Sequence, residues 1–225
     1  MIDFIVNEIF CSINGEGTLT GELAIFIRLA GCNLRCSYCD TTYAQFKDAG
    51  EVLSLDEILA KVRCFKGVNN ITLTGGEPLL HKNVESLLEA LTNDGYLVNI
   101  ETNGSVLLDN ILNKPYSDKL IFACDYKLPD SKMERFMKLK NLNLLREDDV
   151  LKFVIGSNED FAKTKEIIKT YSPKCFIYLS AVFGKVEPVE LVNNLLSWAP
   201  ELNTSKVRVQ LQLHKYIWDP SQKGV

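Results

Sequence analysis

Three cysteines fall within eight residues of this chain, at Cys32, Cys36 and Cys39. The C-x-x-x-C-x-x-C spacing brings three thiolates together on one loop, where they can bind three irons of a cubane iron-sulfur cluster and leave the fourth iron without a protein ligand. Clusters that only transfer electrons are normally closed by a fourth cysteine. The spacing therefore predicts a cluster with an open iron, at which a small molecule can bind and react.

The remaining cysteines do not complete a closed metal site in the sequence. Cys11, Cys64, Cys124 and Cys175 occur singly, without the second Cys or His pair that a structural zinc site usually has. A zinc site built from the loop and one distant ligand is an alternative interpretation, as are three unrelated free thiols. The odd number of cysteines, seven, favours metal ligation or free thiols over a disulfide framework.

Length and composition predict one globular domain over residues 1–225, with 46% hydrophobic and 24% charged residues. The net charge of -4 gives no electrostatic reason to expect binding to nucleic acid or to a membrane surface. No apolar run is long enough to span a bilayer, and the first residues lack the pattern of a signal peptide. We therefore expect a cytoplasmic protein.

Apolar runs of strand length alternate with segments of helical periodicity along the whole chain. The strand-like runs include residues 24–29, 70–74, 96–101, 150–155 and 207–213. Such alternation predicts parallel strands joined by right-handed helical crossovers. The expected fold class is α/β, with a partial (β/α) barrel of about six to seven mostly parallel strands, short of a complete eightfold barrel.

Glycine-rich and polar motifs follow two neighbouring strands. Gly75-Gly76-Glu77-Pro78 comes directly after one strand, and Glu101-Thr102-Asn103-Gly104 ends the next. Ligands bind at the edge where the carboxyl ends of parallel strands meet. The two glycines let the backbone approach a ligand there, so this turn is interpreted as the site of an amino acid's ammonium and carboxylate groups. Glu101 is assigned to the same edge, with a surface or helix-capping residue as the alternative.

Two charged residues near the N-terminus are also candidates. Glu16 lies between Gly15 and Gly17, which predicts a tight loop that presents its carboxylate, although a solvated turn has the same pattern. Arg28 interrupts the apolar run 24–29 and needs a partner. It either pairs with a core carboxylate or binds a substrate carboxylate through its planar guanidinium group.

Together, the cysteine loop and Gly75-Gly76-Glu77-Pro78 resemble the radical S-adenosylmethionine superfamily. Within it, the motifs at residues 14–17, 26–32, 39–41, 101–104 and 212–214 resemble the 7-carboxy-7-deazaguanine synthase family, over essentially the whole chain. This resemblance implies a lyase of queuosine biosynthesis. The implied substrate is the pterin 6-carboxy-5,6,7,8-tetrahydropterin, which undergoes ring contraction with loss of ammonia to give 7-carboxy-7-deazaguanine.

The same resemblance assigns ligands to residues. It implies a 4Fe-4S cluster on Cys32, Cys36 and Cys39, with S-adenosylmethionine chelating the open iron. The implied cofactor-binding residues are Gly75, Gly76, Glu77, Lys127 and Asp40. The implied substrate-binding residues are Asn14, Gly15, Glu16, Gly17, Arg28, Glu101, Thr102, Asn103, Gln212, His214 and Val225. The family more often has Gln where this chain has Asn14. Gln212 and His214 are expected on one side of the last strand.

Further partners are implied by the resemblance alone. Thr41 matches a position that contacts Mg²⁺, although its hydroxyl group could instead cap the helix that follows. A flavodoxin or ferredoxin is the implied electron donor, and a homodimer is the implied assembly. Two other classes stay open at this stage: an activase of glycyl-radical enzymes, which acts on a protein, and a non-enzymatic metal-binding module.

Overall fold

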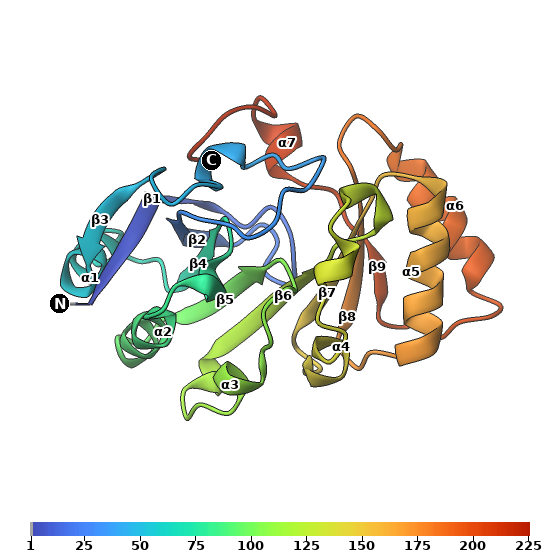
Figure 1. Ribbon diagram of the computed structural model, residues 1–225. Helices are drawn as coiled ribbons and strands as arrows, with labels where there is room; N and C mark the ends of the chain where they lie inside the picture. The colour runs from blue at the N-terminus through green and yellow to red at the C-terminus, as the bar shows by residue number, and fades with distance from the viewer. Residues whose placement is uncertain (1) are drawn as a thin grey trace.

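The computed structural model describes residues 2–225, and one nine-stranded sheet runs through it in the order β3-β1-β2-β4-β5-β6-β7-β8-β9 (Figure 1). Neighbouring strands from β2 to β9 all pair in parallel. These strands are β2 (Leu23–Leu29), β4 (Asn70–Gly75), β5 (Leu97–Thr102), β6 (Leu120–Tyr126), β7 (Val150–Ile155), β8 (Phe176–Ala181) and β9 (Val207–Val209). The expected α/β fold with a mostly parallel, unclosed sheet is confirmed.

Two antiparallel strands extend the sheet beyond β2. The long strand β1 (Asp3–Ile13) pairs with β2 on one side and with β3 (Glu51–Ser54) on the other. The sheet is therefore mostly parallel, as expected, and it has nine strands where six to seven were predicted. The chain reaches β2 from β1 through the tight loop 14–22, which is too short for the helical crossover that a parallel pair needs.

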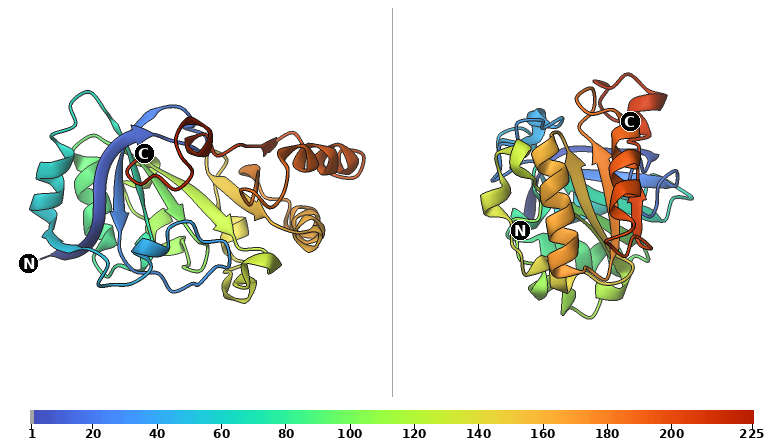
Figure 2. Two further views of the ribbon diagram at one scale, coloured as in Figure 1. Left: turned by 90° about the horizontal axis from the view of Figure 1, so that it is seen from above. Right: turned by 90° about the vertical axis from the view of Figure 1, so that its right-hand side faces the viewer.

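Helices connect most of the parallel strands and cover the sheet (Figures 1 and 2). Helix α1 (Leu55–Val62) begins with a capping box, in which Ser54 and Glu57 bind each other's backbone N–H groups. The others are α2 (Val84–Asn93), α5 (Asn158–Tyr171), α6 (Pro188–Trp198) and the one-turn helices α3 (Asp109–Leu112), α4 (Asn141–Leu144) and α7 (His214–Ile217). No helix among residues 2–225 is both long and apolar enough to cross a membrane.

The alternation of side chains along the strands separates an apolar core from a polar face. Ile27, Leu73, Ile100, Phe122 and Phe153 are fully buried in the core. Because successive residues of a strand point to opposite faces, their immediate neighbours in the strands point to the other side of the sheet. These neighbours are Arg28, Thr74, Glu101, Ala123 and Lys152, and all of them line a single cavity. The pattern of the core thus determines the position of the site.

Candidate active site

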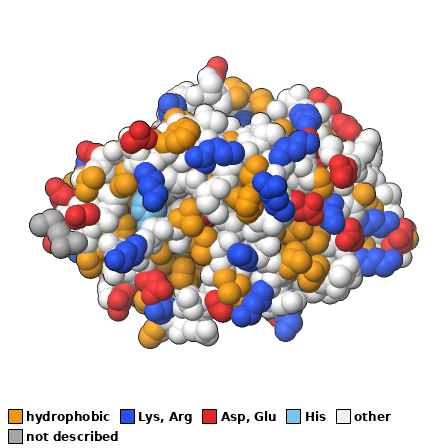
Figure 3. All heavy atoms as spheres, in the orientation of Figure 1, with side chains coloured by type: hydrophobic (Ala, Val, Ile, Leu, Met, Phe, Trp, Pro, Cys, Tyr) orange, Lys and Arg blue, Asp and Glu red, His pale blue; other side chains and the backbone are white. Residues whose placement is uncertain are grey.

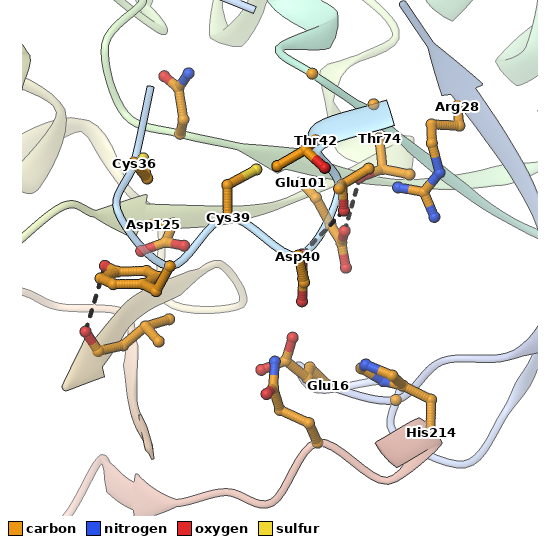
Figure 4. Close-up of a pocket in the computed structure, with 18 of the residues that line it drawn as sticks. Glu16, Arg28, Cys36, Cys39, Asp40, Thr42, Thr74, Glu101, Asp125 and His214 are labelled. Atoms are coloured by element: carbon orange, nitrogen blue, oxygen red, sulfur yellow. Dashed lines mark hydrogen bonds between the residues drawn. The ribbon is translucent and has the colours of Figure 1, made fainter. Parts of the chain in front are cut away.

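A cavity of about 490 Å³ lies at the carboxyl ends of the parallel strands. Figure 4 shows Cys36, Cys39 and Asp125 at one end of it and Glu16 and His214 at the other, with Asp40 and Glu101 between them. Of the residues predicted for the site, those that line the cavity are Gly15, Glu16, Arg28, Cys32, Cys36, Cys39, Asp40, Thr41, Gly75, Gly76, Glu101, Thr102, Asn103, Lys127, Gln212, His214 and Val225. Asn14, Gly17 and Glu77 do not line it.

The three loop cysteines are free thiols that share the wall of this cavity. Burial raises the pKa of Cys32, and it raises that of Cys36 to about 11. Metal binding would displace the protons of these thiols. The described residues contain no group of three or more His, Cys, Asp and Glu side chains arranged around one metal ion.

Gly75 and Gly76 allow the turn after β4 to pack against the cysteine loop. A Cβ atom at Gly75 would lie 2.0 Å from the carbonyl oxygen of Leu29, and one at Gly76 would lie 2.3 Å from that of Gly31. The backbone N–H groups of Gly76 and Glu77 donate to these same carbonyls, of Leu29 and Gly31. The two glycines therefore fix the start of the cysteine loop as well as leaving room for a ligand.

Glu77 lies beneath the cavity wall. Its carboxylate is fully buried and accepts hydrogen bonds from the Thr102 hydroxyl (2.8 Å), the Asn103 backbone N–H (2.6 Å) and the Leu79 backbone N–H (3.1 Å). Burial outweighs these bonds and raises the pKa of Glu77 to about 7. The sequence-based assignment of Glu77 as a direct cofactor ligand is therefore not supported by its position. Its carboxylate holds Thr102 and Asn103 at the cavity wall.

Two ion pairs cross the polar face of the sheet, and their lysines are largely buried. Lys127 Nζ lies 2.6 Å from Asp125 Oδ2, and Lys152 Nζ lies 3.1 Å from Glu16 Oε2. Burial alone would lower the pKa of Lys152, but the negative charges of Glu16, Asp125 and Glu101 together outweigh burial and raise that pKa. Burial likewise tends to raise the pKa of Glu16, and the charge of Lys152 leaves it below its ordinary value. Glu16 is therefore ionised at neutral pH.

Arg28 pairs with a carboxylate, as one of its two sequence interpretations predicted. Its Nε donates to Glu8 Oε1 at 2.7 Å, so it pairs with a carboxylate of β1, and it also lines the cavity. The pair uses Nε, and Glu8 is its only carboxylate partner among residues 2–225. The terminal nitrogens of the guanidinium group are left for a ligand. Glu101 accepts a hydrogen bond from Thr74 (2.8 Å) on the same face, which excludes the exposed surface position.

The loop after β1 contributes to the site in two ways. Gly15 and Glu16 line the cavity, whereas Asn14 is buried beside β4 and accepts a hydrogen bond from Thr72 at 2.6 Å. The N–H group of Gly17 donates to the Gln210 side chain at 2.9 Å. Asn14 and Gly17 therefore position the loop and do not contact the cavity.

The C-terminal segment forms part of the cavity wall. The last strand is shorter than predicted and ends at Val209. The backbone N–H of Gln210 still donates to Leu179 of β8, while its side chain binds Gly17. Gln212 and His214 consequently do not lie on a strand, and His214 begins helix α7. Both still line the cavity, as does Val225 at the C-terminus. His214 packs so closely on Gly15 that a Cβ there would lie 2.3 Å from its ring nitrogen Nδ1.

Asp40 and Thr41 lie at the end of the cysteine loop. The Thr41 hydroxyl donates to Asp40 at 2.9 Å and makes no capping bond to the short 3₁₀ segment that follows, so the capping alternative is wrong. Lys215 of α7 lies 3.0 Å from Asp40. Although partial burial tends to raise the pKa of Asp40, the charge of Lys215 and the hydrogen bonds from Lys215 and Thr41 together lower it to about 2. This ion pair links the cysteine loop to the C-terminal segment.

Comparison with known proteins agrees with this arrangement. Residues 26–118 match the model of the Radical SAM superfamily. A 7-carboxy-7-deazaguanine synthase of Clostridium acetobutylicum is 46% identical over the full length of both chains, and one of Leptospira interrogans is 37% identical over 98% of this chain and 97% of its own. The chain belongs to the 7-carboxy-7-deazaguanine synthase family. The crystal structure of QueE from Escherichia coli shares its fold, with a TM-score of 0.74, 22% identity and coverage of 95% of this chain and 96% of the other.

As a member of the 7-carboxy-7-deazaguanine synthase family and of the radical SAM superfamily, the chain is an enzyme that uses a 4Fe-4S cluster and S-adenosylmethionine. The residues of the cavity fit both the 4Fe-4S cluster and S-adenosylmethionine. The three thiols face the cavity without disulfide partners, and the glycine turn lies directly beside them. Buried Asp125 Oδ1 has no hydrogen-bond partner within the part of the chain that the structure describes, which leaves an acceptor for a bound ligand.

Sequence reasoning missed Asp125 and Lys152 as site residues. The only signal for Lys152 was a charge inside the apolar run 150–155, the same signal that identified Arg28. Asp125 follows the apolar run of β6 and lies next to Lys152 in the pairing of β6 with β7. The pairing of Lys152 with Glu16 joins residues 136 positions apart, which no local pattern encodes.

Proposed function

We propose that this chain converts 6-carboxy-5,6,7,8-tetrahydropterin to 7-carboxy-7-deazaguanine with loss of ammonia. The observation that carries the proposal is the 46% identity to a 7-carboxy-7-deazaguanine synthase over the full length of both chains. The cavity supports it, because one wall carries the three cluster cysteines and the other carries Glu16 and Arg28. We also propose that residues 1–225 act as one domain, since all nine strands belong to one sheet.

When bound, the cluster and S-adenosylmethionine supply a deoxyadenosyl radical that removes a hydrogen atom from the substrate. The protein's own residues hold the two reactants beside each other. Cys32, Cys36 and Cys39 bind the iron, and the backbone at Gly75 and Gly76 binds the methionine moiety. Lys127 offsets the charge of the methionine carboxylate, and Asp125 accepts a hydrogen bond from the bound cofactor through its unpaired oxygen.

Substrate recognition uses the opposite end of the cavity. The ionised Glu16 accepts hydrogen bonds from the amino and ring N–H groups of the pterin, and Lys152 keeps it ionised. Arg28 binds the substrate carboxylate with its terminal nitrogens while Glu8 fixes its Nε. Glu101, Thr102, Asn103, Gln212, His214 and Val225 provide further contacts, whereas Asn14 and Gly17 act by fixing the loop around Glu16.

Magnesium and protein partners form the finer part of the proposal. The Thr41 hydroxyl provides one hard oxygen ligand for Mg²⁺, with substrate oxygens and water completing the octahedron. A flavodoxin or ferredoxin delivers the electron, and the enzyme works as a homodimer in the cytoplasm.

Anaerobic incubation of reconstituted protein with reductant, S-adenosylmethionine and the carboxy-tetrahydropterin tests the proposal, with mass detection of the deazapurine. Product formation supports it. Absence of product from protein that carries four irons per chain would contradict the substrate assignment. A glycyl radical formed on a partner protein would then support the activase, and stoichiometric zinc without iron would support a metal-binding module.

A further inference from the structure

A short exposed segment beside the cysteine loop is unusually basic. Residues 132–140 include Lys132, Arg135, Lys138 and Lys140 and a single acidic residue, Glu134, in a chain whose net charge is -4. The four basic side chains are exposed. Lys140 pairs with Asp109, and Glu134 pairs with Lys163. Figure 3 shows Lys and Arg side chains along the middle of the face of the molecule that Figure 1 presents.

This segment is held directly against the outer side of the cysteine loop. The backbone N–H of Ser37 donates to the carbonyl of Ser131 (3.2 Å), and its hydroxyl donates to that of Asp130 (2.6 Å). The N–H group of Arg35 points at the sulfur of Met133, 3.4 Å away. Arg35 and Ser37 are exposed on the outer side of the loop, while Cys36 between them lines the cavity.

Apolar surface lies among these charges. Phe46 and Phe136 are 58% and 38% exposed, and each is covered by a guanidinium group, Arg35 over Phe46 and Arg135 over Phe136. Exposed aromatic rings among basic side chains are typical of protein-binding surfaces. We call this surface the basic face; it consists of Arg35, Phe46, Lys132, Arg135, Phe136 and Lys138.

We propose that the basic face is the docking surface for an acidic protein that carries a one-electron donor; this inference rests on the proposed function. The cluster has to accept one electron in each reductive step, and the carrier is oxidised by one electron as the cluster is reduced by one. The basic face lies directly against the outer side of the cysteine loop, and its charge attracts an acidic carrier and repels a basic one.

Stopped-flow reduction of the reconstituted cluster by a reduced, acidic flavodoxin tests the proposal, because it requires neither substrate nor turnover. The test variant is the double substitution Lys132→Glu and Lys138→Glu, neither of which lines the cavity. The matched control is Lys66→Glu with Lys174→Glu, two exposed lysines that precede β4 and β8 at the opposite edge of the sheet. Both variants change the net charge equally.

We expect the test variant to slow flavodoxin-dependent reduction at least about 10-fold at low ionic strength, with a smaller difference at high salt. Reduction by dithionite should be equal in all three proteins, since a small reductant needs no docking surface. Equal rates with flavodoxin in both variants would overturn the proposal. Tight binding of tRNA to this face, lost only in the test variant while flavodoxin reduction is unchanged, would also overturn it. Failure of wild-type protein to form the deazapurine despite normal flavodoxin reduction would instead contradict the proposed function alone.

Discussion

The side-chain nitrogen Nδ2 of Asn103 donates a hydrogen bond to the sulfur of Cys32 across 3.6 Å. The orientation of this amide is fixed from both ends. Its Oδ1 accepts from the backbone N–H of Ser105 at 3.0 Å, and Nδ2 also donates to Asn33 at 3.2 Å. Since an amide nitrogen has two protons, one is directed at Asn33 and the other at the sulfur. Asn103 therefore connects the end of β5 to a cluster ligand.

Removing this hydrogen bond should change the cluster's reduction potential. A hydrogen bond to a ligand sulfur stabilises the more negatively charged, reduced cluster, so Asn103→Ala should shift the midpoint potential to a more negative value. Redox titration followed by electron paramagnetic resonance measures this shift without S-adenosylmethionine or substrate. Asn33→Ala is the control, because it removes the neighbouring amide and leaves the bond to sulfur. An unchanged potential in Asn103→Ala would contradict the prediction.

The cysteines divide into two groups with different expected roles. Replacing Cys32, Cys36 or Cys39 by Ala should abolish the four-iron cluster and all activity that depends on it, because each thiolate binds its own iron. Cys64 is exposed and lies outside the cavity, so Cys64→Ala should keep the full iron content. Iron and sulfide analysis after anaerobic reconstitution measures both. A loop variant that retains four irons would show that another residue supplies the ligand.

Gly76→Ala should displace the cysteine loop, because Gly76 lies in the turn after β4 that packs against this loop. The added Cβ would lie 2.3 Å from the carbonyl oxygen of Gly31 and 2.8 Å from the Cβ of Cys32, so the loop has to move. We expect lower iron content and binding of S-adenosylmethionine weakened at least about 10-fold. Gly67→Ala is the control, because its Cβ would meet nothing within 4 Å and only the left-handed backbone adds strain. Full iron content and unchanged cofactor affinity in Gly76→Ala would contradict this account.

The sequence predicted the parts of the fold that have a local signal. The apolar runs identified strands β2, β4, β5 and β7, and because the strands are parallel, the motifs that follow β4 and β5 could be placed at one edge. Strand β3 was missed because it has only four residues, of which Glu51 and Val52 are exposed, so it has no apolar run. The early end of β9 was missed because the chain after it packs on the first loop, through contacts such as that of Gln210 with Gly17, 193 positions apart.

The candidate site likewise contains residues that a local sequence motif identifies and roles that depend on contacts between distant parts of the chain. The cysteines, the glycine turn, Glu16 and Arg28 belong to short motifs, and all of them line the cavity. The indirect role of Glu77 could not be read from Gly-Gly-Glu-Pro, because the groups that its carboxylate binds, at Thr102 and Asn103, belong to another strand. The pairing of Glu16 with Lys152 likewise depends on how β7 lies beneath the first loop.

The Glu16–Lys152 pair should stabilise the fold at neutral pH. Lys152→Met leaves a mostly buried carboxylate without its partner, which we expect to reduce the free energy of unfolding by about 3 kcal/mol at pH 7. The pKa of Glu16 is lowered in the folded protein, so the stability that the pair contributes is present above pH 4.5 and is lost as the pH falls through the folded value. Urea denaturation of the variant and wild type at pH 7 and pH 3.5 measures this.

The double variant Glu16→Gln with Lys152→Met is the matched control for that experiment. Because it removes the unpaired charge, it should recover part of the stability that Lys152→Met loses. Equal losses at both pH values, or no recovery in the double variant, would show that the methylene chain of Lys152 stabilises the protein by packing and that its charge does not.

Glu77 should have the opposite effect on the pH dependence of stability. Its pKa is raised from 4.5 to about 7, so between these values the folded state holds a proton that the unfolded state has lost, and stability falls as the pH rises. In Glu77→Gln this fall should be absent, so the wild-type decline between pH 4.5 and 7 should exceed that of the variant, by on the order of 3 kcal/mol at most. Denaturation of the metal-free proteins across this range measures the difference.

Glu57→Gln is the control, since the exposed Glu57 has its pKa lowered by hydrogen bonds from Ser54 and should not reproduce the effect. Parallel curves for wild type and Glu77→Gln would show that Glu77 stays ionised in the folded protein, held by its hydrogen bonds from Thr102 and Asn103.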